Sequence, residues 1–243
     1  MITLRVLGAA VAVRADIAYR FADIPRTDAP PDAEVLADSP PAALTELTRL
    51  AVEHSPLLCV HAGVVSGPEG LLAIPGESGL GKTTLVAALV RAGFGYVSDE
   101  ALAVDRATGQ VSAFARPLAL RGDVWTLLGD GIGPAPSPDS EQLVAPSLLG
   151  RVDTDDAQVR DIVLARRDGG PLRVETAARG DAVRALLAHA FNHYRAPEAS
   201  FRAVVALVRD ARVWRATYAD APDLAAGLGE LLGVQSASAT EAR

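Results

Sequence analysis

The sequence of 243 residues contains one cysteine and no long uninterrupted apolar segment. Because Cys59 has no second cysteine to pair with, an intrachain disulfide is excluded, and a reducing cytoplasm is the expected location. No apolar run reaches about 18 residues, so we expect no membrane-spanning segment. The N-terminal stretch alternates apolar and polar residues and carries Arg5 and Arg14, a pattern typical of strands and not of a secretory signal.

Basic residues are fewer than acidic ones, 23 against 30, which gives a formal net charge of −7. A surface that binds nucleic acid needs clustered Lys and Arg, so we expect no nucleic-acid partner. Apolar residues make up 49% of the chain and charged residues 22%, an ordinary balance for a globular protein. The chain can therefore bury a sizeable core in one large α/β domain, with room for a small N-terminal appendage.

Lysine is nearly absent from the chain. Lys and Arg together number 23, and since Lys82 is the only lysine, the remaining 22 are arginine. A compact ammonium group can sit between two phosphates as a point charge, whereas the planar guanidinium of Arg is broader. The single departure from arginine therefore indicates a site that requires an ammonium group.

We expect three parts along the chain: a small cap over residues 1–54, a main domain over residues 55–234 and a frayed tail over residues 235–243. The pattern of the cap predicts a β-hairpin, then a connector rich in Pro and Asp, and then a short helix. The hairpin strands are expected at residues 2–6 and 11–18, and the helix at residues 42–53.

The first half of the main domain alternates strands with one helix. Strands are predicted at residues 57–65, 70–74, 94–98, 102–105 and 111–114, and the helix at residues 81–91. The last two strands flank a hairpin-type turn from Arg106 to Gly109. Adjacent antiparallel strands do not fit a parallel doubly wound sheet, so we predict an α/β fold with a mixed, partly antiparallel sheet.

The second half begins with residues 129–147, which are rich in Gly and Pro and are read either as a mobile lid or as a surface loop. Another hairpin is expected from strands at residues 159–166 and 172–175. We further predict helices at residues 181–194 and 201–209, a strand at 213–218 and a final helix to residue 232. Asp181 and Asp223 are the expected N-caps of the first and last of these helices.

The segment GESGLGKT follows an apolar strand and precedes a helical pattern. Its glycines permit backbone N–H groups to turn inward around an anion, and the helix adds its positive N-terminal end. In such a phosphate-binding loop Lys82 neutralises the β- and γ-phosphates, and the hydroxyl of Thr83 ligates Mg²⁺. The pattern predicts ATP and Mg²⁺ as cofactors, with ATP held by Gly76, Glu77, Ser78, Gly79, Leu80, Gly81, Lys82, Thr83 and Thr84.

Two acidic residues, Asp99 and Glu100, end the next apolar strand, with Asp99 17 residues after Lys82. A carboxylate there suits either the Mg²⁺ shell or the acceptor hydroxyl, and adjacent carboxylates raise each other's pKa, which favours a proton acceptor. Arg116 and Arg121 follow the antiparallel strands and are candidates for a phosphate clamp. For each arginine taken singly, a solvated surface side chain is the competing interpretation.

His61 lies in an otherwise apolar strand, between Val60 and Ala62. A lone histidine in such a strand is usually a core residue with a satisfied hydrogen bond. From the residues alone, that interpretation stands beside a role in catalysis.

The order of these motifs resembles the catalytic core of the HPr kinase/phosphorylase family, and specifically its small stand-alone bacterial relatives. In that family a His lies on the strand before a loop of the form G-x-S-G-x-G-K-[ST], and an acidic pair follows one strand later. Here His61 lies 21 residues before Lys82 and Asp99 lies 17 after it. The resemblance covers the stretch from His61 to Arg121; the family's C-terminal signature is not recognised in this chain.

The resemblance implies a phosphoenolpyruvate-carboxykinase-like P-loop fold with antiparallel strands. It also implies that Asp99 is the base that takes the proton of the acceptor hydroxyl, that His61 orients Asp99, and that Glu100 joins Thr83 at the metal. Relatives of this kind are similar to kinases found beside ribosomal-peptide pathways such as lasso peptides, where a precursor Ser is phosphorylated. Members of the family often form oligomers, so the resemblance leaves a homo-oligomer open.

Three functions remain open at this point. The first is an ATP-dependent kinase that acts on a hydroxyl group, foremost a Ser of a peptide or protein. The second is a small-molecule kinase of the same fold, which would have a closed polar acceptor pocket in place of an open groove. The third is a nucleotide-binding switch or regulatory ATPase without an acceptor.

Overall fold

A computed structural model describes residues 1–77, 81–125, 128 and 134–234 of the chain. The predicted loop residues Ser78, Gly79 and Leu80 and the predicted frayed tail lie outside the described residues, as do residues 129–133 of the Gly- and Pro-rich segment. Within the described residues, no helix combines the length and the apolar character needed to cross a membrane.

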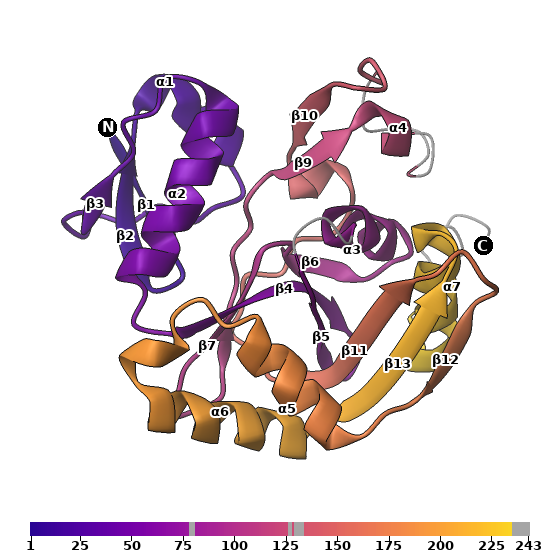
Figure 1. Ribbon diagram of the computed structural model, residues 1–243. Coiled ribbons are helices and arrows are strands. Elements are labelled where there is room, and N and C mark those ends of the chain that lie inside the picture. The colour runs from indigo at the N-terminus through magenta and orange to yellow at the C-terminus, as the bar shows by residue number, and fades with distance from the viewer. Residues whose placement is uncertain (78–80, 126–127, 129–133, 235–243) are drawn as a thin grey trace, which may run out of the picture.

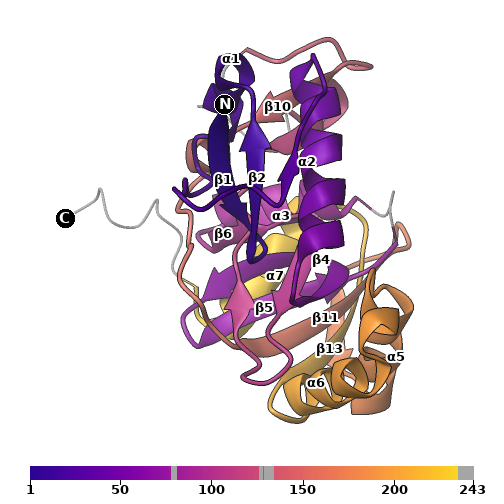
Figure 2. The same ribbon diagram turned by 90° about the vertical axis from the view of Figure 1, so that its left-hand side faces the viewer.

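The first 54 residues form a small sheet with one long helix beside it (Figures 1 and 2). Strands β1 (Ile2–Val6) and β2 (Ala9–Val13) make the predicted hairpin, and β3 (Ala33–Glu34) pairs with β2. The turn consists of Leu7 and Gly8, both with positive φ, which is the geometry that a tight two-residue hairpin requires. The helical elements are α1 (Ala15–Ala18), the 3₁₀ helix η1 (Tyr19–Phe21) and α2 (Pro40–His54).

The second strand of this hairpin is shorter than predicted. It ends at Val13, and α1 occupies the stretch expected to continue the strand to residue 18. The amide of Ala18 donates to the carbonyl of Arg14, so a helical turn replaces sheet pairing there. Residues of this region share a core with Cys59, Ala101 and Ala103 of the main sheet and with Phe114, two residues after β8. The division into a cap and a main domain stays a prediction.

The main sheet has eight strands in the order β12-β13-β11-β5-β4-β7-β8, with β6 pairing beside them on β4. Strands β4, β6, β7 and β8 pair antiparallel, while β5, β11 and β13 run parallel to one another. The predicted α/β class with a mixed sheet is therefore confirmed. The bounds are β4 (Leu58–Gly67), β5 (Gly70–Pro75), β6 (Gly95–Ser98), β7 (Ala101–Val104), β8 (Val111–Ser112), β11 (Val159–Arg167), β12 (Arg173–Thr176) and β13 (Arg212–Tyr218).

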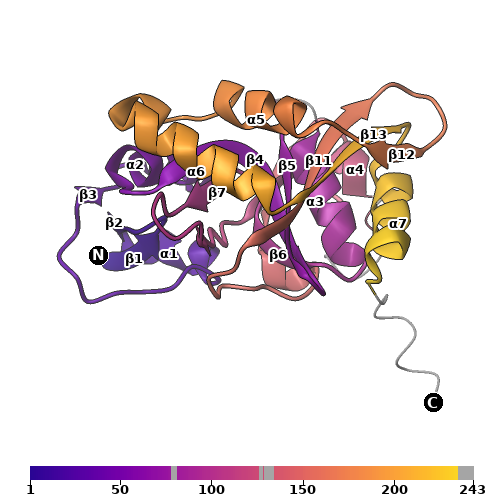
Figure 3. The same ribbon diagram turned by 90° about the horizontal axis from the view of Figure 1, so that it is seen from below.

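Helices cover both faces of this sheet (Figure 3). The core on one face is shared with α3 (Lys82–Arg91) and α7 (Ala221–Leu232), and the core on the other with α5 (Arg179–Ala188) and α6 (Pro197–Arg209). Strand β5 serves both cores, because Leu72 and Ile74 face α3 while Leu71 and Ala73 face the opposite side. An apolar strand buried on both faces thus leads directly into the predicted phosphate loop.

A separate two-stranded sheet, β9 (Leu118–Arg121) with β10 (Glu141–Val144), lies near α4 (Gly122–Trp125). Strand β10 was not predicted, since its segment was read as a lid or a loop. The remaining short elements are the 3₁₀ helices η2 (Pro146–Leu148) and η3 (His193–Arg195).

Three further predictions for the second half need correction. Strand β12 pairs with β13, not with β11, because β13 lies between them in the sheet. Helix α5 begins at Arg179, before the expected cap Asp181, and ends at Ala188, because the following backbone bonds to β4. The N-cap of α7 is Asp220, whose side chain accepts from the amide of Asp223.

Candidate active site

The phosphate-loop motif lies between β5, which ends at Pro75, and α3, which begins at Lys82. Gly81 caps this helix with a φ of 78°, a left-handed conformation that glycine adopts without strain. It places the first turn of α3 directly after the loop. Gly81 and Thr84 also border a small cavity of about 70 Å³, which Tyr218 and Asp220 line from the other side.

The side chain of Lys82 folds back over the loop. Its Nζ donates to the carbonyl oxygens of Gly76, at 2.9 Å, and Glu77, at 2.5 Å. Lys82 is only 8% exposed, and this burial lowers the pKa of its ammonium group, while the charges of Glu100 and Asp99 act in the opposite direction. The only lysine of the chain is therefore held at the backbone of Gly76 and Glu77.

Asp99 is enclosed by three partners immediately after β6. Its Oδ2 accepts from the hydroxyl of Thr83 at 3.0 Å, and its Oδ1 accepts from the Tyr96 hydroxyl, also at 3.0 Å. The Nε of Arg116 lies 3.3 Å from the same Oδ1. The exposed fraction of the Asp99 side chain is 0%, so its carboxylate faces the start of α3 and not solvent.

Glu100 is the more open of the two carboxylates, with a side chain that is 26% exposed. Its Oε2 accepts from Arg116 Nη1 at 3.2 Å, and its Oε1 lies 3.6 Å from His61 Nε2. Partial burial raises the pKa of Glu100; the Asp99 charge adds to this effect, and the charges of Arg116 and Lys82 oppose it. The carboxylates of Asp99 and Glu100, which are adjacent in the sequence, thus lie in different surroundings.

The His61 ring lies on β4 beside Glu100. Burial, together with the nearby charges of Lys82 and His189, lowers the pKa of His61 to about 4, so the ring is neutral near pH 7. The ring of Phe191 packs against it with a centroid distance of 5.4 Å. The resemblance implied that His61 orients Asp99; the carboxylate oxygen found 3.6 Å from its ring belongs to Glu100 instead.

The two arginines predicted as phosphate clamps lie in different surroundings. Arg116 is 8% exposed and lies between Asp99 and Glu100, and its Nη1 also donates to Thr48 Oγ1 at 3.0 Å. The side chain of Arg121 is 60% exposed on β9 and pairs with Asp123. Arg116 therefore joins the acidic pair, and Arg121 is a surface side chain of the smaller sheet.

Sequence reasoning did not single out Tyr96 or Thr48. A tyrosine in a fully buried strand needs a partner for its hydroxyl, and this signal was present three residues before Asp99. Thr48 gave no such signal. Its contact joins α2 to Arg116, which follows it by 68 positions.

The segment after α5 was also missed, because it was assigned to a helix. The His61 amide donates to His189 O and the Phe191 amide to Cys59 O, so residues 189–191 run along β4. The side chain of Asn192 completes the pairing: it accepts from the Cys59 amide and donates to Leu57 O, each at 2.9 Å. These bonds bring Phe191 to the candidate site.

A cavity of about 590 Å³ opens beside Glu100 and Arg116, and we call it the α2 groove. One wall is α2, and the other is the segment from Phe191 to Arg195. Neither Asp99 nor any described residue of the phosphate loop lines it. Its lining residues are Thr45, Thr48, Arg49, Val52, Glu53, Glu100, Arg116, Phe191, Asn192, Tyr194 and Arg195.

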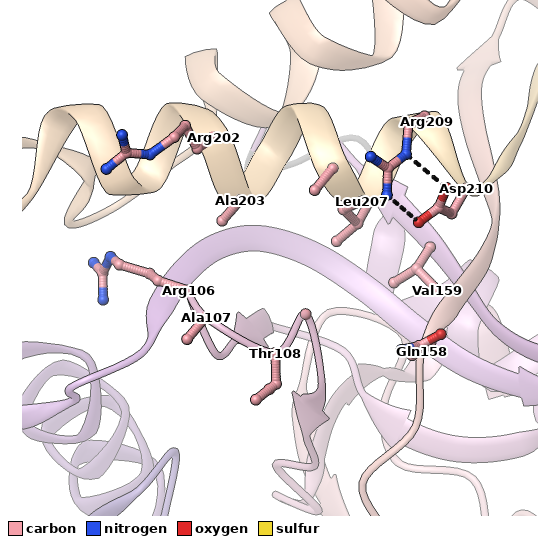
Figure 4. Close-up of a pocket in the computed structure, with 12 residues that line it drawn as sticks. Arg106, Ala107, Thr108, Gln158, Val159, Arg202, Ala203, Leu207, Arg209 and Asp210 are labelled. Carbon is pink, nitrogen blue, oxygen red and sulfur yellow. Dashed lines mark hydrogen bonds and ion pairs between the residues drawn. The ribbon is translucent and has the colours of Figure 1, made fainter.

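Another cavity, of about 380 Å³, lies between α6 and the turn that follows β7 (Figure 4). Arg106 and Arg202 lie toward one end and the Arg209–Asp210 pair at the other, with apolar side chains between them. None of the predicted site residues lines this cavity. We therefore take the α2 groove, and not this cavity, as the one that belongs to the candidate site.

The described residues contain no cluster of three or more His, Cys, Asp or Glu side chains that could hold a metal ion. Mg²⁺ commonly binds to one or two protein side chains together with phosphate oxygens, without a full protein cage. The hydroxyl of Thr83 beside the carboxylate of Asp99 is a donor set of this kind. These residues therefore fit a Mg²⁺ ion that arrives with a nucleotide.

No protein-family model and no curated protein matches the chain. Among solved structures, the chain is similar to the Hpr(Ser) kinase/phosphatase from Coxiella burnetii, with 16% sequence identity and a TM-score of 0.36. The match covers 71% of this chain and 94% of that one. A similarity of this size establishes neither a family nor an activity for the chain.

Proposed function

We propose that this protein is a Mg²⁺- and ATP-dependent kinase that transfers the γ-phosphoryl group to a hydroxyl, foremost a Ser of a peptide or protein. One observation carries the proposal: the acidic pair is divided between two surroundings. Asp99 bonds to Thr83 at the start of α3, while Glu100 lines the α2 groove. A kinase needs this arrangement, because the phosphate donor and the acceptor must meet at one point from different sides.

On the donor side, Lys82 would neutralise the β- and γ-phosphates, together with loop amides and the N-terminal end of α3. Thr83 and Asp99 would hold Mg²⁺, which supplies charge neutralisation on the phosphate oxygens when it is bound. Lys82 lies over the backbone of Gly76 and Glu77, so its ammonium group is already at the loop. A fixed charge of this kind costs little reorganisation when charge develops during transfer.

On the acceptor side, the contacts favour Glu100 as the base, with Asp99 at the metal, which is the reverse of the roles implied by the resemblance. Glu100 would take the proton of the acceptor hydroxyl. At the same time the hydroxyl oxygen would bond to the γ-phosphorus, and the bond between that phosphorus and the oxygen of the ADP leaving group would break. Its raised pKa makes it a stronger proton acceptor. Neutral His61 and charged Arg116 would hold its carboxylate in place.

The openness of the α2 groove favours a peptide or protein acceptor over a small molecule. Arg49, Glu53, Phe191, Tyr194 and Arg195 line the groove and are all exposed, so its walls do not close around a small acceptor. We further propose that the protein is an HPr-kinase-like P-loop kinase, as its sequence motifs suggest. The acceptor that this resemblance implies is a Ser of a ribosomal precursor peptide. A regulatory ATPase remains the alternative, because water can also enter an open groove.

The decisive experiment compares Glu100→Gln with Asp99→Asn. We measure transfer from labelled ATP to Ser-containing peptides, and Mg·ATP binding by calorimetry. Glu100→Gln should lower kcat by about 10²–10⁴-fold, the usual contribution of a general base, and leave Mg·ATP affinity nearly unchanged. Asp99→Asn should weaken Mg·ATP binding itself.

Three results would contradict this account. Wild-type transfer by Glu100→Gln would remove Glu100 as the base, and loss of transfer alone in Asp99→Asn would return that role to Asp99. Steady ATP hydrolysis that added peptides and hydroxyl compounds do not change would favour the regulatory ATPase.

A further inference from the structure

Hydrogen bonds hold both walls of the α2 groove in place, one wall to the acidic pair and the other to the backbone at β4. On the α2 side, Thr48 accepts from Arg116 Nη1, and the same nitrogen donates to Glu100. On the other side, Asn192 is bonded to β4 through the backbone of Leu57 and Cys59. A segment lying in the groove would therefore be held in a defined position relative to the Glu100 carboxylate.

The two walls are also joined to each other at the end of α2. Arg195 Nη1 donates to the carbonyl oxygen of Glu53 at 2.6 Å. The guanidinium of Arg195 lies over the Tyr194 ring, 5.9 Å from its centroid. The arginine is thus held at the rim of the groove by the backbone on one side and an aromatic face on the other.

The charge of the groove is opposite in sign to that of the chain. Arg116 is already paired with the acidic residues, so the rim charges are Arg49, Arg195 and Glu53. This excess of positive charge occurs in a chain whose formal net charge is −7. The Arg49–Glu53 pair is an exposed ion pair at 2.6 Å, of a kind that contributes only about 0–1 kcal/mol, so Arg49 can exchange this partner for another carboxylate.

The rim carries exposed aromatic side chains in addition to these charges. Phe191 is 38% exposed and Tyr194 is 64% exposed, and both line the groove. Large aromatic side chains beside arginines are typical of surfaces that bind polypeptide segments. A volume of about 590 Å³ also exceeds what a single serine side chain needs.

We propose that the α2 groove binds an acidic peptide segment, with Arg49 and Arg195 pairing with carboxylates that flank the acceptor Ser. Helix α2, through Arg49, and η3, through Arg195, would together determine the specificity of the kinase. This inference rests on the proposed function, because it assigns the class of acceptor for that same site. Rim charges act mainly on specificity and on the rate of association, so their effect is expected on kcat/KM more than on kcat.

The test uses three synthetic peptides that share one Ser-containing sequence and differ only in the flanking residues, which are Glu, Gln or Lys. The full chain is assayed for transfer from labelled ATP, and peptide binding is measured separately by fluorescence anisotropy without nucleotide. We expect kcat/KM for the Glu peptide to exceed that for the Gln peptide by about tenfold, with the Lys peptide lowest. The double variant Arg49→Glu and Arg195→Glu should reverse this order.

Arg202→Glu is the matched control for the charge reversal. Arg202 forms an exposed ion pair with Glu198 across one helical turn, as Arg49 does with Glu53, but it lies on α6 and does not line the groove. It should leave the order of the three peptides unchanged. Reversal of the order by Arg202→Glu would mean that net charge, and not the groove, selects the peptide.

The outcomes separate this inference from the function on which it rests. Equal binding and equal transfer for all three peptides would overturn the preference for acidic peptides, and the proposed kinase function would be unaffected. Preferential binding of the Glu peptide without transfer would support the groove as a site for acidic peptides and contradict the proposed kinase function. Transfer to free serine or a small hydroxy acid, with no binding of any peptide, would overturn the peptide acceptor.

Discussion

Asp99 and Glu100 are neighbours in the chain, yet the two sides of the acidic pair are built differently. Apart from Arg116, the described residues on the side that faces Asp99 come from the stretch between Gly76 and Asp99, and Lys82 there is only 8% exposed. The side that faces Glu100 comes from distant segments, α2 and residues 191–195, and most of its lining is exposed. The difference fits the proposed kinase, in which nucleotide and acceptor would approach the acidic pair from different sides, and the predictions below test this contrast.

The largest effect is expected at Lys82. Lys82→Ala should lower kcat/KM for transfer by about a thousandfold, because a fixed charge on the phosphates is lost. Calorimetry should find weaker Mg·ATP binding in the same variant. Lys82→Arg should be nearly as impaired, since the broader guanidinium replaces a compact ammonium; transfer by Lys82→Arg at the wild-type rate would contradict the argument from the solitary lysine.

Arg116 connects the two sides of the acidic pair. Its replacement should lower the free energy of unfolding more than any other substitution in the groove. Arg116→Met leaves the enclosed Asp99 carboxylate without its cationic partner, which should lower the free energy of unfolding by about 3–5 kcal/mol. Urea unfolding measures this change. Arg121→Met, an exposed counterpart, should shift it by less than about 0.5 kcal/mol.

A second variant sharpens the prediction for Arg116. Adding Asp99→Asn to Arg116→Met removes the unpaired charge, so part of the lost stability should return. If the double variant is less stable than Arg116→Met by the full cost of Asp99→Asn alone, the two side chains are not coupled in the way that their 3.3 Å contact implies.

The next effect concerns the pH dependence that His61 confers. Its pKa of about 4 in the folded state lies below the ordinary value of 6.5, so the unfolded chain takes up a proton first as the pH falls. Between about pH 7 and about pH 5 this linkage should lower the free energy of unfolding by about 2 kcal/mol. In His61→Gln the same decrease should be smaller by that amount, and identical pH profiles of urea unfolding would refute the assignment.

The smallest effect is expected at Thr48, on the acceptor wall. Thr48→Val keeps the shape of the side chain but removes the oxygen that accepts from Arg116 Nη1, at a cost of about 1 kcal/mol of stability. Thr48→Ser retains the oxygen and should restore the wild-type value. A loss in Thr48→Ser equal to that in Thr48→Val would indicate that the methyl group, and not the hydrogen bond, matters.

The sequence predicted the donor side better than the acceptor side, for a physical reason. The strand β5, the glycine at the start of α3 and the carboxylates after β6 each follow from local patterns within a short stretch. The predicted mixed sheet followed in the same way from the turn at residues 105–110, which joins β7 to the short strand β8.

The acceptor side depends on contacts between distant residues that no local pattern encodes. Residues 189–192 were predicted to continue the helix, but their backbone bonds to β4, and this tertiary pairing ends the helix at Ala188. The partner of β12 depends in the same way on β13, which comes later in the chain. The meeting of Thr48 with Arg116 follows only once α2 has packed beside the sheet.

The shared core under α2 has a consequence for how the protein can be shortened. Cys59, Ala101 and Ala103 of the main sheet, and Phe114 just after β8, are each at most 1% exposed, and they share a core with side chains of the first 54 residues. Removal of residues 1–54 would expose this apolar surface to solvent. It would also remove α2, which is one wall of the α2 groove. We expect a fragment of this kind to self-associate through the uncovered patch, so a stable shortened chain would have to keep residues 1–54.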